Sequence, residues 1–174
     1  MWRAWCLTAA WLVWGAAAAA AEPPRPVRAG AAAVDISPRD LPVNMPGGFA
    51  ENIAEKVHDP LHARALILDD GTTRLALVVV DNVGVGQETA EEIKSLASRR
   101  CGIVPERILL SATHSHSCPP ANVVDGPPAE VAYRKILIEG TAEAIARAAG
   151  RPPPGAGGGG AEPPPPPGGK RPAV

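Results

Sequence analysis

The residues most able to do chemistry in this chain are two histidines that stand one residue apart. His114 and His116 lie in the run Ser-Ala-Thr-His-Ser-His-Ser-Cys-Pro-Pro, which begins at Ser111 and follows the apolar segment 108–110. Pro119 and the proline after it disfavour a helix here, so we expect an extended backbone. In an extended segment, side chains at positions i and i+2 point to the same side. Two imidazoles that project together from the end of a strand suit a zinc site or paired acid–base catalysis.

The same residues also fit simpler roles. His114 could be a loop histidine that is hydrogen-bonded to the backbone, and His116 could be a second ligand or a structural partner of His114. Cys118 could join both histidines around a metal. Asp81 could accept a hydrogen bond from a ligand histidine, or it could simply cap the end of its strand.

The other two histidines are weaker candidates for a site. His58 is followed by Asp59 and Pro60, a sequence that favours a turn in which the histidine side chain is already satisfied. His62 enters an apolar segment, and we expect a structural role for both histidines. The chain has no Gly-x-Ser-x-Gly motif, so the sequence gives no support for a serine hydrolase.

Short apolar segments predict the strands that must position these residues. Residues 31–36 and 63–68 predict two strands, and the Asp-Asp-Gly turn at 69–71 predicts a hairpin from the second strand into a third at 75–80. This third strand has no polar alternation, which predicts burial on both of its faces. Residues 108–110 predict a fourth, buried strand.

Two helices complete the set of predicted elements. Thr89-Ala-Glu-Glu92 predicts a capping box that opens the first helix. Arg99 and Arg100 suit the negative end of its dipole, and Gly102 predicts its end. Residues 129–149 predict a second helix that is interrupted at Gly140.

These elements predict an α/β fold, with a partial mixed sheet, a right-handed strand–helix–strand crossover and a C-terminal helix. The strands at 75–80 and 108–110 should be parallel, so Asp81 and the two histidines should meet at one edge of the sheet. Ligands bind at that edge in open α/β sheets. Cys101 should lie at the opposite end, roughly 15–17 Å from Cys118. We therefore predict no disulfide between these two cysteines.

The two ends of the chain differ in composition from its centre. Residues 1–21 carry Arg3, an apolar stretch and small residues before Glu22. This pattern predicts a cleaved signal peptide and export, to the periplasm or outside the cell, with no transmembrane anchor left after cleavage. We expect residues 22–150 to be the folded unit. Residues 151–174 are rich in Pro and Gly and have no apolar periodicity, which predicts disorder.

Charge and composition limit the classes of function. The formal net charge is -1, so electrostatics give no basis for binding nucleic acid. Aromatic residues make up 3% of the chain, and all four tryptophans fall within the predicted signal peptide. We therefore expect a core of Val, Leu, Ile and Ala.

Four segments resemble the neutral/alkaline (non-lysosomal) ceramidase family. Residues 113–119 are similar to the Thr-His-Thr-His-Ser-Gly-Pro signature of that family, with Cys118 where the family has glycine. Residues 28–38, 44–48 and 57–66 resemble its opening strand, its early glycine-containing turn and its histidine-containing segment, in the same order. The resemblance covers only the N-terminal portion of the family's catalytic domain.

The resemblance implies a zinc-dependent amidohydrolase that cleaves the N-acyl amide bond of ceramide to give a sphingoid base and a fatty acid. The substrate could also be another N-acyl amide at a membrane surface. It implies that His114 binds the zinc and that the catalytic His116 hydrogen-bonds the attacked carbonyl. The other zinc ligands of the family, a His, a Glu and a Tyr, come from much later in its chains. We therefore expect a truncated chain with an incomplete site, inactive alone. The alternative is a non-catalytic exported remnant or binding domain.

Overall fold

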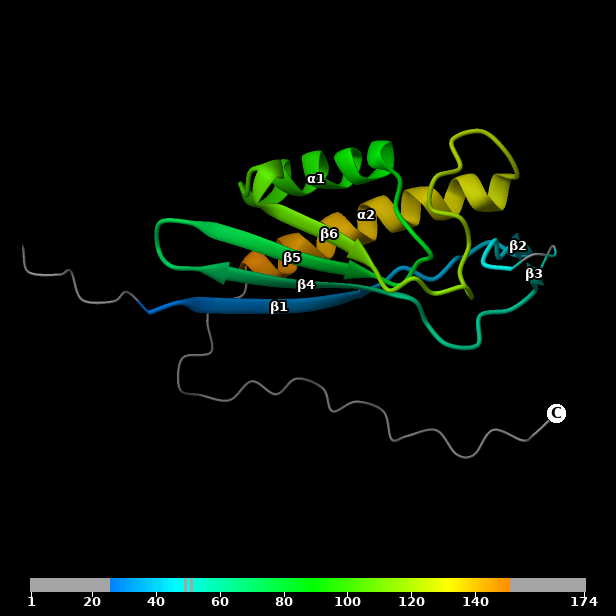
Figure 1. The fold of residues 1–174 in the computed structure, drawn as a ribbon, viewed down its shortest axis with the longest axis horizontal. Helices are drawn as coiled ribbons and strands as arrows, with labels where there is room; N and C mark the ends of the chain where they lie inside the picture. The colour runs from blue at the N-terminus through cyan, green and yellow to red at the C-terminus, as the bar shows by residue number, and fades with distance from the viewer. Residues whose placement is uncertain (1–25, 49, 51, 151–174) are drawn as a thin grey trace, which may run out of the picture.

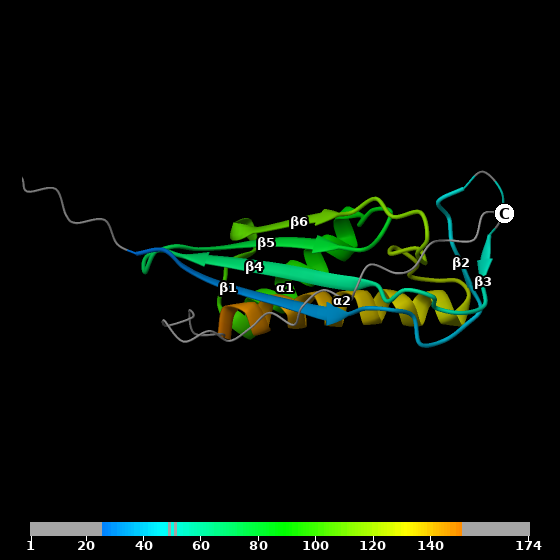
Figure 2. The ribbon, with the colours of Figure 1, turned by 90° about the horizontal axis from the view of Figure 1, so that it is seen from below.

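The computed structural model describes residues 26–48, 50 and 52–150. A four-stranded sheet, in the order β1-β4-β5-β6, carries both long helices on one of its faces (Figures 1 and 2). The predicted signal peptide, 1–21, and the Pro/Gly-rich segment, 151–174, lie outside the described residues. The predicted α/β class, with a mixed sheet and a C-terminal helix, is confirmed.

The strands of the main sheet combine antiparallel and parallel pairs. β1, β4 and β5 are antiparallel neighbours, whereas β5 and β6 are parallel, with Val78 opposite Leu110. The hairpin between β4 and β5 turns at Gly71, whose φ of 86° suits glycine, as the Asp-Asp-Gly signal predicts. The strands run over Arg28–Asp35 (β1), Val43–Asn44 (β2), Ile53–Ala54 (β3), His62–Asp69 (β4), Arg74–Val80 (β5) and Ile108–Ala112 (β6). β2 and β3 form a separate small antiparallel sheet.

The first helix, α1 (Gln87–Cys101), connects β5 to β6 by a right-handed crossover, as predicted. Its N-terminus differs from the prediction, because it begins at the cap residue Gly86 and no side chain caps it. Thr89 is buried inside the first turn and donates a hydrogen bond to the carbonyl of Ala121 (3.3 Å), so it forms no capping box. The C-terminus is as predicted, since Gly102 has a left-handed φ of 73° and donates its N–H to Ser98.

The second helix, α2 (Pro128–Gly150), is continuous through Gly140, so the predicted interruption is wrong. Glycine is needed at position 140 because a larger residue would collide with a neighbouring side chain. A Cβ at residue 140 would lie 2.6 Å from Cγ2 of Ile36, a fully buried residue that follows β1. The missing side chain therefore lets α2 lie close against the end of β1.

The helices cover one face of the sheet, and this explains a second error of prediction. On β5, Ala76, Val78 and Val80 are buried against the helices, whereas Leu75, Leu77 and Val79 are 38% to 43% exposed. The strand is therefore not buried on both faces. The apolar run hides its alternation because the residues on both faces are aliphatic. β6 behaves in the same way: Ile108 is buried and Leu109 is 63% exposed.

The core lies between the sheet and the helices and is mostly aliphatic, as predicted. Val78 from the sheet, Ile93 from α1 and Leu137 from α2 belong to one buried cluster, together with Tyr133, its single large aromatic side chain in the described part. Across the helix pair, Arg134 of α2 forms an ion pair with Glu92 of α1. Within the described residues, no helix has the length and apolar character needed to cross a membrane.

Candidate functional site

The carboxyl ends of the parallel strands β5 and β6 meet at one edge of the sheet, as predicted. Asp81 follows β5 directly, and the loop 113–119, which we call the histidine loop, follows β6. Figure 1 shows this edge at the right-hand end of the molecule, next to the small β2–β3 sheet. Crevices at the carboxyl ends of strands are the usual ligand sites of open α/β sheets.

The histidine loop is tied to the segment that follows β5. Thr113 donates its backbone N–H to the carbonyl of Val80 (3.0 Å), and Ser115 donates to the carbonyl of Asn82 (3.1 Å). Between these two contacts, His114 has a φ of 59°, in the left-handed region. A non-glycine residue there costs of order 1 kcal/mol, and histidine is among the residues that tolerate it best. The predicted extended backbone is therefore wrong at His114.

The two imidazoles nevertheless lie together. The ring centroids of His114 and His116 are 4.9 Å apart, with the rings edge to face at 75°, and both side chains are exposed. The expected proximity of the two rings is therefore present, but the expected extended backbone is not its cause. The turn at His114, rather than an extended strand, places the two rings side by side.

The hydrogen bond of His114 determines which nitrogen is available for chemistry. Nδ1 of His114 lies 2.8 Å from the carbonyl oxygen of Val83. A carbonyl oxygen only accepts hydrogen bonds, so Nδ1 must carry the proton. In the neutral ring, Nε2 then has the free lone pair, which is the arrangement found in metal-ligating histidines whose other nitrogen donates to the protein.

His116 is in contact with a glycine that sequence reasoning did not connect with it. A Cβ added at Gly47 would lie 2.3 Å from Cβ and 2.4 Å from Cα of His116, so only glycine fits there. Gly47 belongs to the turn that follows β2, and the sequence singled out this turn only through the family resemblance. The pair Gly47-Gly48 was a signal of a tight turn, but nothing in it named the partner.

Asn82 is the second residue that sequence reasoning missed. Its side chain is fully buried, and its amide nitrogen donates to the carbonyl of Pro119 (2.9 Å) and to the hydroxyl of Tyr133 (3.2 Å). Its main-chain carbonyl accepts from Ser115. Asn82 therefore holds both ends of the histidine loop and ties them to α2. The sequence pointed to Asn82 only through its position, since it follows Asp81 directly after an apolar strand.

Tyr133 has a structural role in this network. Burial raises the pKa of its hydroxyl far above the ordinary value. The group therefore stays protonated, and its oxygen accepts the hydrogen bond from Asn82.

Asp81 adopts the simpler of its two predicted roles. Its Oδ2 accepts hydrogen bonds from the backbone N–H of His62 (2.9 Å) and from the guanidinium of Arg64 (2.8 Å). It thereby joins the ends of β5 and β4. The ring of His114 donates to Val83 instead, so Asp81 does not orient it.

The remaining histidines lie apart from the pair. His58 is highly exposed and forms an ion pair with Asp59 (3.2 Å) next to Pro60, which agrees with the predicted turn. His62 begins β4 opposite Asp35. Among residues 26–48, 50 and 52–150, no group of three or more His, Cys, Asp and Glu side chains is placed to hold a metal ion.

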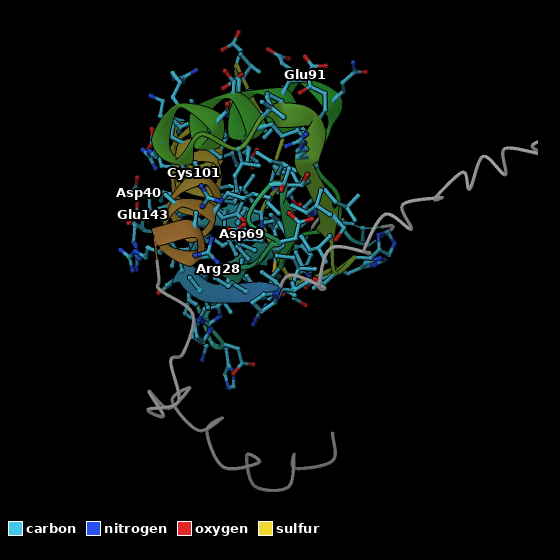
Figure 3. All side chains as sticks on the ribbon, turned by 90° about the vertical axis from the view of Figure 1, so that its left-hand side faces the viewer. Arg28, Asp40, Asp69, Glu91, Cys101 and Glu143 are labelled. Atoms are coloured by element: carbon cyan, nitrogen blue, oxygen red, sulfur yellow. The ribbon has the colours of Figure 1, made fainter. Side chains whose placement is uncertain are left out.

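Cys118 does not extend the histidine pair into a metal site. It is buried, and its thiol donates a hydrogen bond to the carbonyl of Ser115 (3.1 Å), three residues earlier. Burial raises the pKa of this thiol, so the thiolate that a metal needs is disfavoured. Cys101 lies at the opposite end of the molecule, near Arg28 and Asp69, as predicted (Figure 3). Both cysteines are free.

The difference between the two cysteines predicts selective alkylation. In the folded protein at pH 8, iodoacetamide should modify Cys118 at least about tenfold more slowly than the half-buried Cys101, because alkylation requires an accessible thiolate. Peptide mass spectrometry over time measures both rates. In urea the two rates should become equal. Equal rates in the folded state would mean that Cys118 is not buried.

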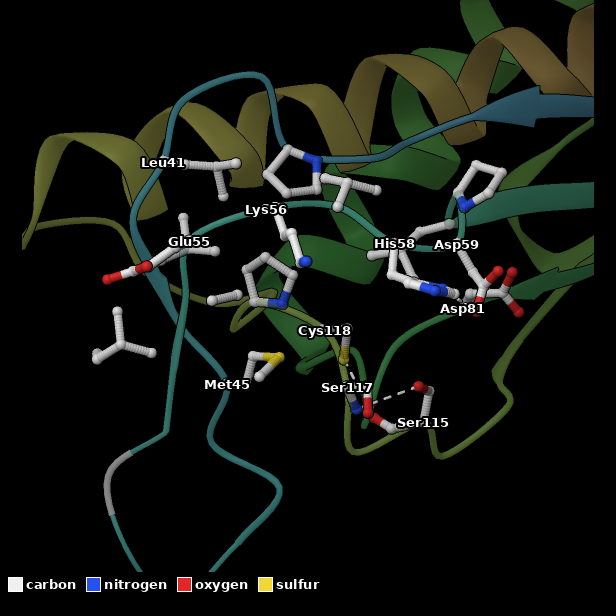
Figure 4. Close-up of a pocket in the computed structure, with 18 residues that line it drawn as sticks. Leu41, Met45, Glu55, Lys56, His58, Asp59, Asp81, Ser115, Ser117 and Cys118 are labelled. Atoms are coloured by element: carbon white, nitrogen blue, oxygen red, sulfur yellow. Dashed lines mark hydrogen bonds and ion pairs between the residues drawn. The ribbon is translucent and has the colours of Figure 1, made fainter. Parts of the chain in front are cut away.

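A cavity of about 810 Å³ lies beside the histidine loop, between the loop and residues 38–61 (Figure 4). Leu41, Val43, Met45 and Val57 give it apolar walls, and Ser115, Ser117 and Cys118 close it on the loop side; the remaining lining residues are Pro38, Ile53, Ala54, Glu55, Lys56, His58, Asp59, Pro60, Leu61, Asp81 and Pro119. The side chain of Lys56 points into it. The cavity therefore adjoins the serines on either side of His116, while the two imidazoles lie next to it.

The comparisons with known proteins agree with this arrangement at the level of fold. The solved structures that match include one of neutral ceramidase from Pseudomonas aeruginosa and one described as a ceramidase complexed with C2. Each superposes with a TM-score of 0.58 at 23% sequence identity, over 71% of this chain. The chain spans only 21% of the length of those solved chains. No family model and no curated protein matches the sequence. From these findings the chain has a ceramidase-like fold.

Proposed function

We propose that this chain is the histidine-bearing portion of a zinc-dependent amide hydrolase of the neutral ceramidase kind. The observation that carries the proposal is the hydrogen bond from Nδ1 of His114 to Val83, which leaves Nε2 of the neutral ring with a free lone pair at the carboxyl edge of the sheet. The signature in residues 113–119 and the ceramidase-like fold support it. The substrate would be ceramide or another N-acyl amide.

In this proposal His114 holds zinc through Nε2. Bound zinc polarises a carbonyl and lowers the pKa of a bound water to about 7. A catalytic zinc usually has three protein ligands, and the described residues offer no such group around His114. The remaining ligands would therefore come from residues outside the described part or from a longer chain, in keeping with a match that covers a fifth of the solved ceramidase structures.

His116 would act on the carbonyl oxygen of the amide. Its ring lies 4.9 Å from the ring of His114, measured between centroids, so a group bound at one ring is within reach of the other. A ring N–H that donates to this oxygen stabilises the negative charge that develops during attack, and one donor of this kind can change a rate by about 100-fold or more. The contact with Gly47 fixes the backbone that carries this ring.

The adjoining cavity would bind the apolar part of the substrate. Its aliphatic walls fit an acyl chain, and the hydroxyls of Ser115 and Ser117 are available to polar groups near the amide. Such a substrate resides in a membrane, so the protein would work at a membrane surface after export. Export rests on residues 1–21 of the sequence alone.

Zinc binding tests the proposal. In the purified chain, titration with zinc should shift the ring resonances of His114 in histidine NMR spectra, and His114→Ala should abolish this saturable binding. His58→Ala is the matched control, because His58 is an exposed histidine of the same cavity region and pairs only with Asp59. Zinc binding that survives in His114→Ala and disappears in His58→Ala would overturn the assignment of the metal to His114.

Hydrolysis of a fluorescent ceramide in detergent micelles separates an enzyme from a binding unit. We expect the chain alone to give no turnover, because His114 has no further ligands among the described residues. Turnover that requires zinc and both histidines would instead mean that the chain completes the site with residues outside the described part.

A further inference from the structure

The cavity beside the histidine loop has large apolar side chains that remain in contact with solvent. Leu41, Ile53 and Val57 line it and are 37%, 45% and 40% exposed. Val43 and Met45 line the same space. Single exposed apolar residues are ordinary, but several that converge on one concavity indicate a binding site.

The walls of the cavity favour a flexible aliphatic chain over an aromatic ligand. The described lining residues include no Phe, Tyr or Trp, so a flat ring would find no aromatic side chain to stack on. The thioether of Met45 is flexible and adapts to the shape of a bound chain. The volume of about 810 Å³ lies within the range of roughly 300–1,000 Å³ that is typical of small-molecule sites.

One positive charge is directed into this apolar space. The side chain of Lys56 points into the cavity (Figure 4), and Lys56 is the single lysine or arginine among the described residues that line it. Two of the three lining carboxylates are already paired, Asp59 with His58 and Asp81 with Arg64. These two carboxylates are therefore not free to neutralise the ammonium of Lys56.

The third lining carboxylate belongs to Glu55, the residue next to Lys56. In Figure 4 the carboxylate of Glu55 and the ammonium of Lys56 point in different directions, with the ammonium towards the middle of the cavity. Within the described part of the chain, Lys56 therefore forms no ion pair. An ammonium beside apolar walls and without a partner favours a ligand that brings its own negative charge.

We propose that the cavity binds a single-chain amphiphile with an anionic end group. The aliphatic chain would lie along Leu41, Ile53 and Val57, and the anion would pair with the ammonium of Lys56. A free fatty acid, the acid product of the hydrolysis proposed above, has this chemistry. The inference goes beyond the proposed function, because it requires neither zinc nor turnover.

The exposure of Lys56 sets the size of the expected preference. Lys56 is exposed, so its pairing should contribute modestly and should weaken with salt. We expect an anionic end group to improve affinity about fivefold over an uncharged one on the same chain at low salt, and less at about 1 M salt. A lysine ammonium is a compact point charge, so both a carboxylate and a phosphate can pair with it.

Titration of the purified chain with soluble single-chain probes tests the proposal. The methyl NMR resonance of Met45 is the readout, because Met45 is the one methionine among the described residues and lines the cavity. Octanoate should shift this resonance saturably at an about fivefold lower concentration than octanol. Octylammonium, which has the same chain and the opposite charge, should bind no better than octanol. Octyl phosphate should bind as an anion too, and the tighter of the two anions identifies the end group.

Substitutions of Lys56 separate its charge from its bulk. Lys56→Met should lose the preference for octanoate and keep the binding of octanol, because methionine retains the apolar stem without the charge. Lys56→Arg should keep the preference. Lys94→Met is the matched control, because Lys94 lies on α1, which contributes no residue to the described lining. Circular dichroism verifies that all three variants are folded.

Tighter binding of octylammonium than of octanoate would overturn the proposal, and would mean that Glu55 sets the charge of the cavity. Equal binding of octanoate and octanol to the unmodified chain would overturn it as well. The same holds for a preference for octanoate that survives in folded Lys56→Met, and for a Met45 resonance that none of the probes shifts. The titrations contain no zinc, so these failures would leave the assignment of the metal to His114 unchanged.

Discussion

Replacing Asn82 with leucine should destabilise the fold by about 3 kcal/mol, although leucine has the same branched shape and the same number of side-chain heavy atoms. The side chain of Asn82 is fully buried and satisfies three groups at once: the carbonyl of Pro119, the hydroxyl of Tyr133 and the backbone N–H of Gly84. Each buried polar group that loses its partner costs about 1–3 kcal/mol. Urea denaturation followed by circular dichroism measures the loss as a lower midpoint at unchanged slope.

Asn122→Leu provides the matched control for this change. Its side-chain oxygen also accepts a backbone hydrogen bond, from Gly86 (2.7 Å), but at an exposed position where water can replace the contact. We expect a loss below about 1 kcal/mol. If both variants lose the same stability, the buried network around Asn82 does not hold the histidine loop.

The Asn82 variant should also affect the site. The loop would lose its anchor at Pro119 and keep only backbone contacts from Thr113 and Ser115. The ring of His114 should then no longer be held on Val83, and zinc should bind less tightly to Asn82→Leu than to Asn122→Leu under conditions where both are folded.

Local sequence patterns were sufficient to predict the frame that positions the site. The hairpin followed from the Asp-Asp-Gly turn, and the parallel pair followed from a helix between two apolar segments. Because parallel strands end at the same edge, the pattern also predicted that Asp81 and the histidines would lie together. The structure confirms each of these predictions.

The errors arose where contacts distant in sequence decide the local structure. The backbone of His114 is set by hydrogen bonds to Val80, Asn82 and Val83, and the prolines that suggested an extended chain do not control it. The exposure of Leu77 depends on which face the helices cover, and an all-aliphatic strand gives no indication of this. Gly140 faces Ile36, about a hundred residues earlier, so its packing purpose is invisible in the helix pattern.

The candidate site was predicted only in part for the same reason. The histidine pair is visible in the sequence because its two residues are separated by a single serine and are of a distinctive type. Asn82 and Gly47 are ordinary residues whose importance depends on contacts with Pro119, Tyr133 and His116. Residue type and spacing therefore located the histidine pair but not the residues that hold it in place.

Gly47→Ala should displace His116 and disrupt the histidine pair. The new Cβ would lie 2.3 Å from Cβ of His116, whereas carbon atoms in contact are about 3.5–4.0 Å apart. The atoms it meets belong to the backbone and to the first carbon of the side chain, so a change of rotamer at His116 cannot relieve the overlap. The turn and the loop must separate by more than 1 Å, roughly, and overpacking of this kind costs about 1–3 kcal/mol.

Gly48→Ala is a stringent control because it changes the neighbouring residue in the same way. A Cβ at Gly48 would lie 3.6 Å from the nearest atom, the carbonyl oxygen of Ala50, which is an ordinary packing distance. Neither glycine has a φ in the left-handed region, so backbone strain does not distinguish the two variants. Histidine NMR should show loss of the close contact between the rings of His114 and His116 in Gly47→Ala and its retention in Gly48→Ala. An intact ring contact in folded Gly47→Ala would mean that the turn does not position His116, and that the histidine loop is held by Asn82 and the end of β5 alone.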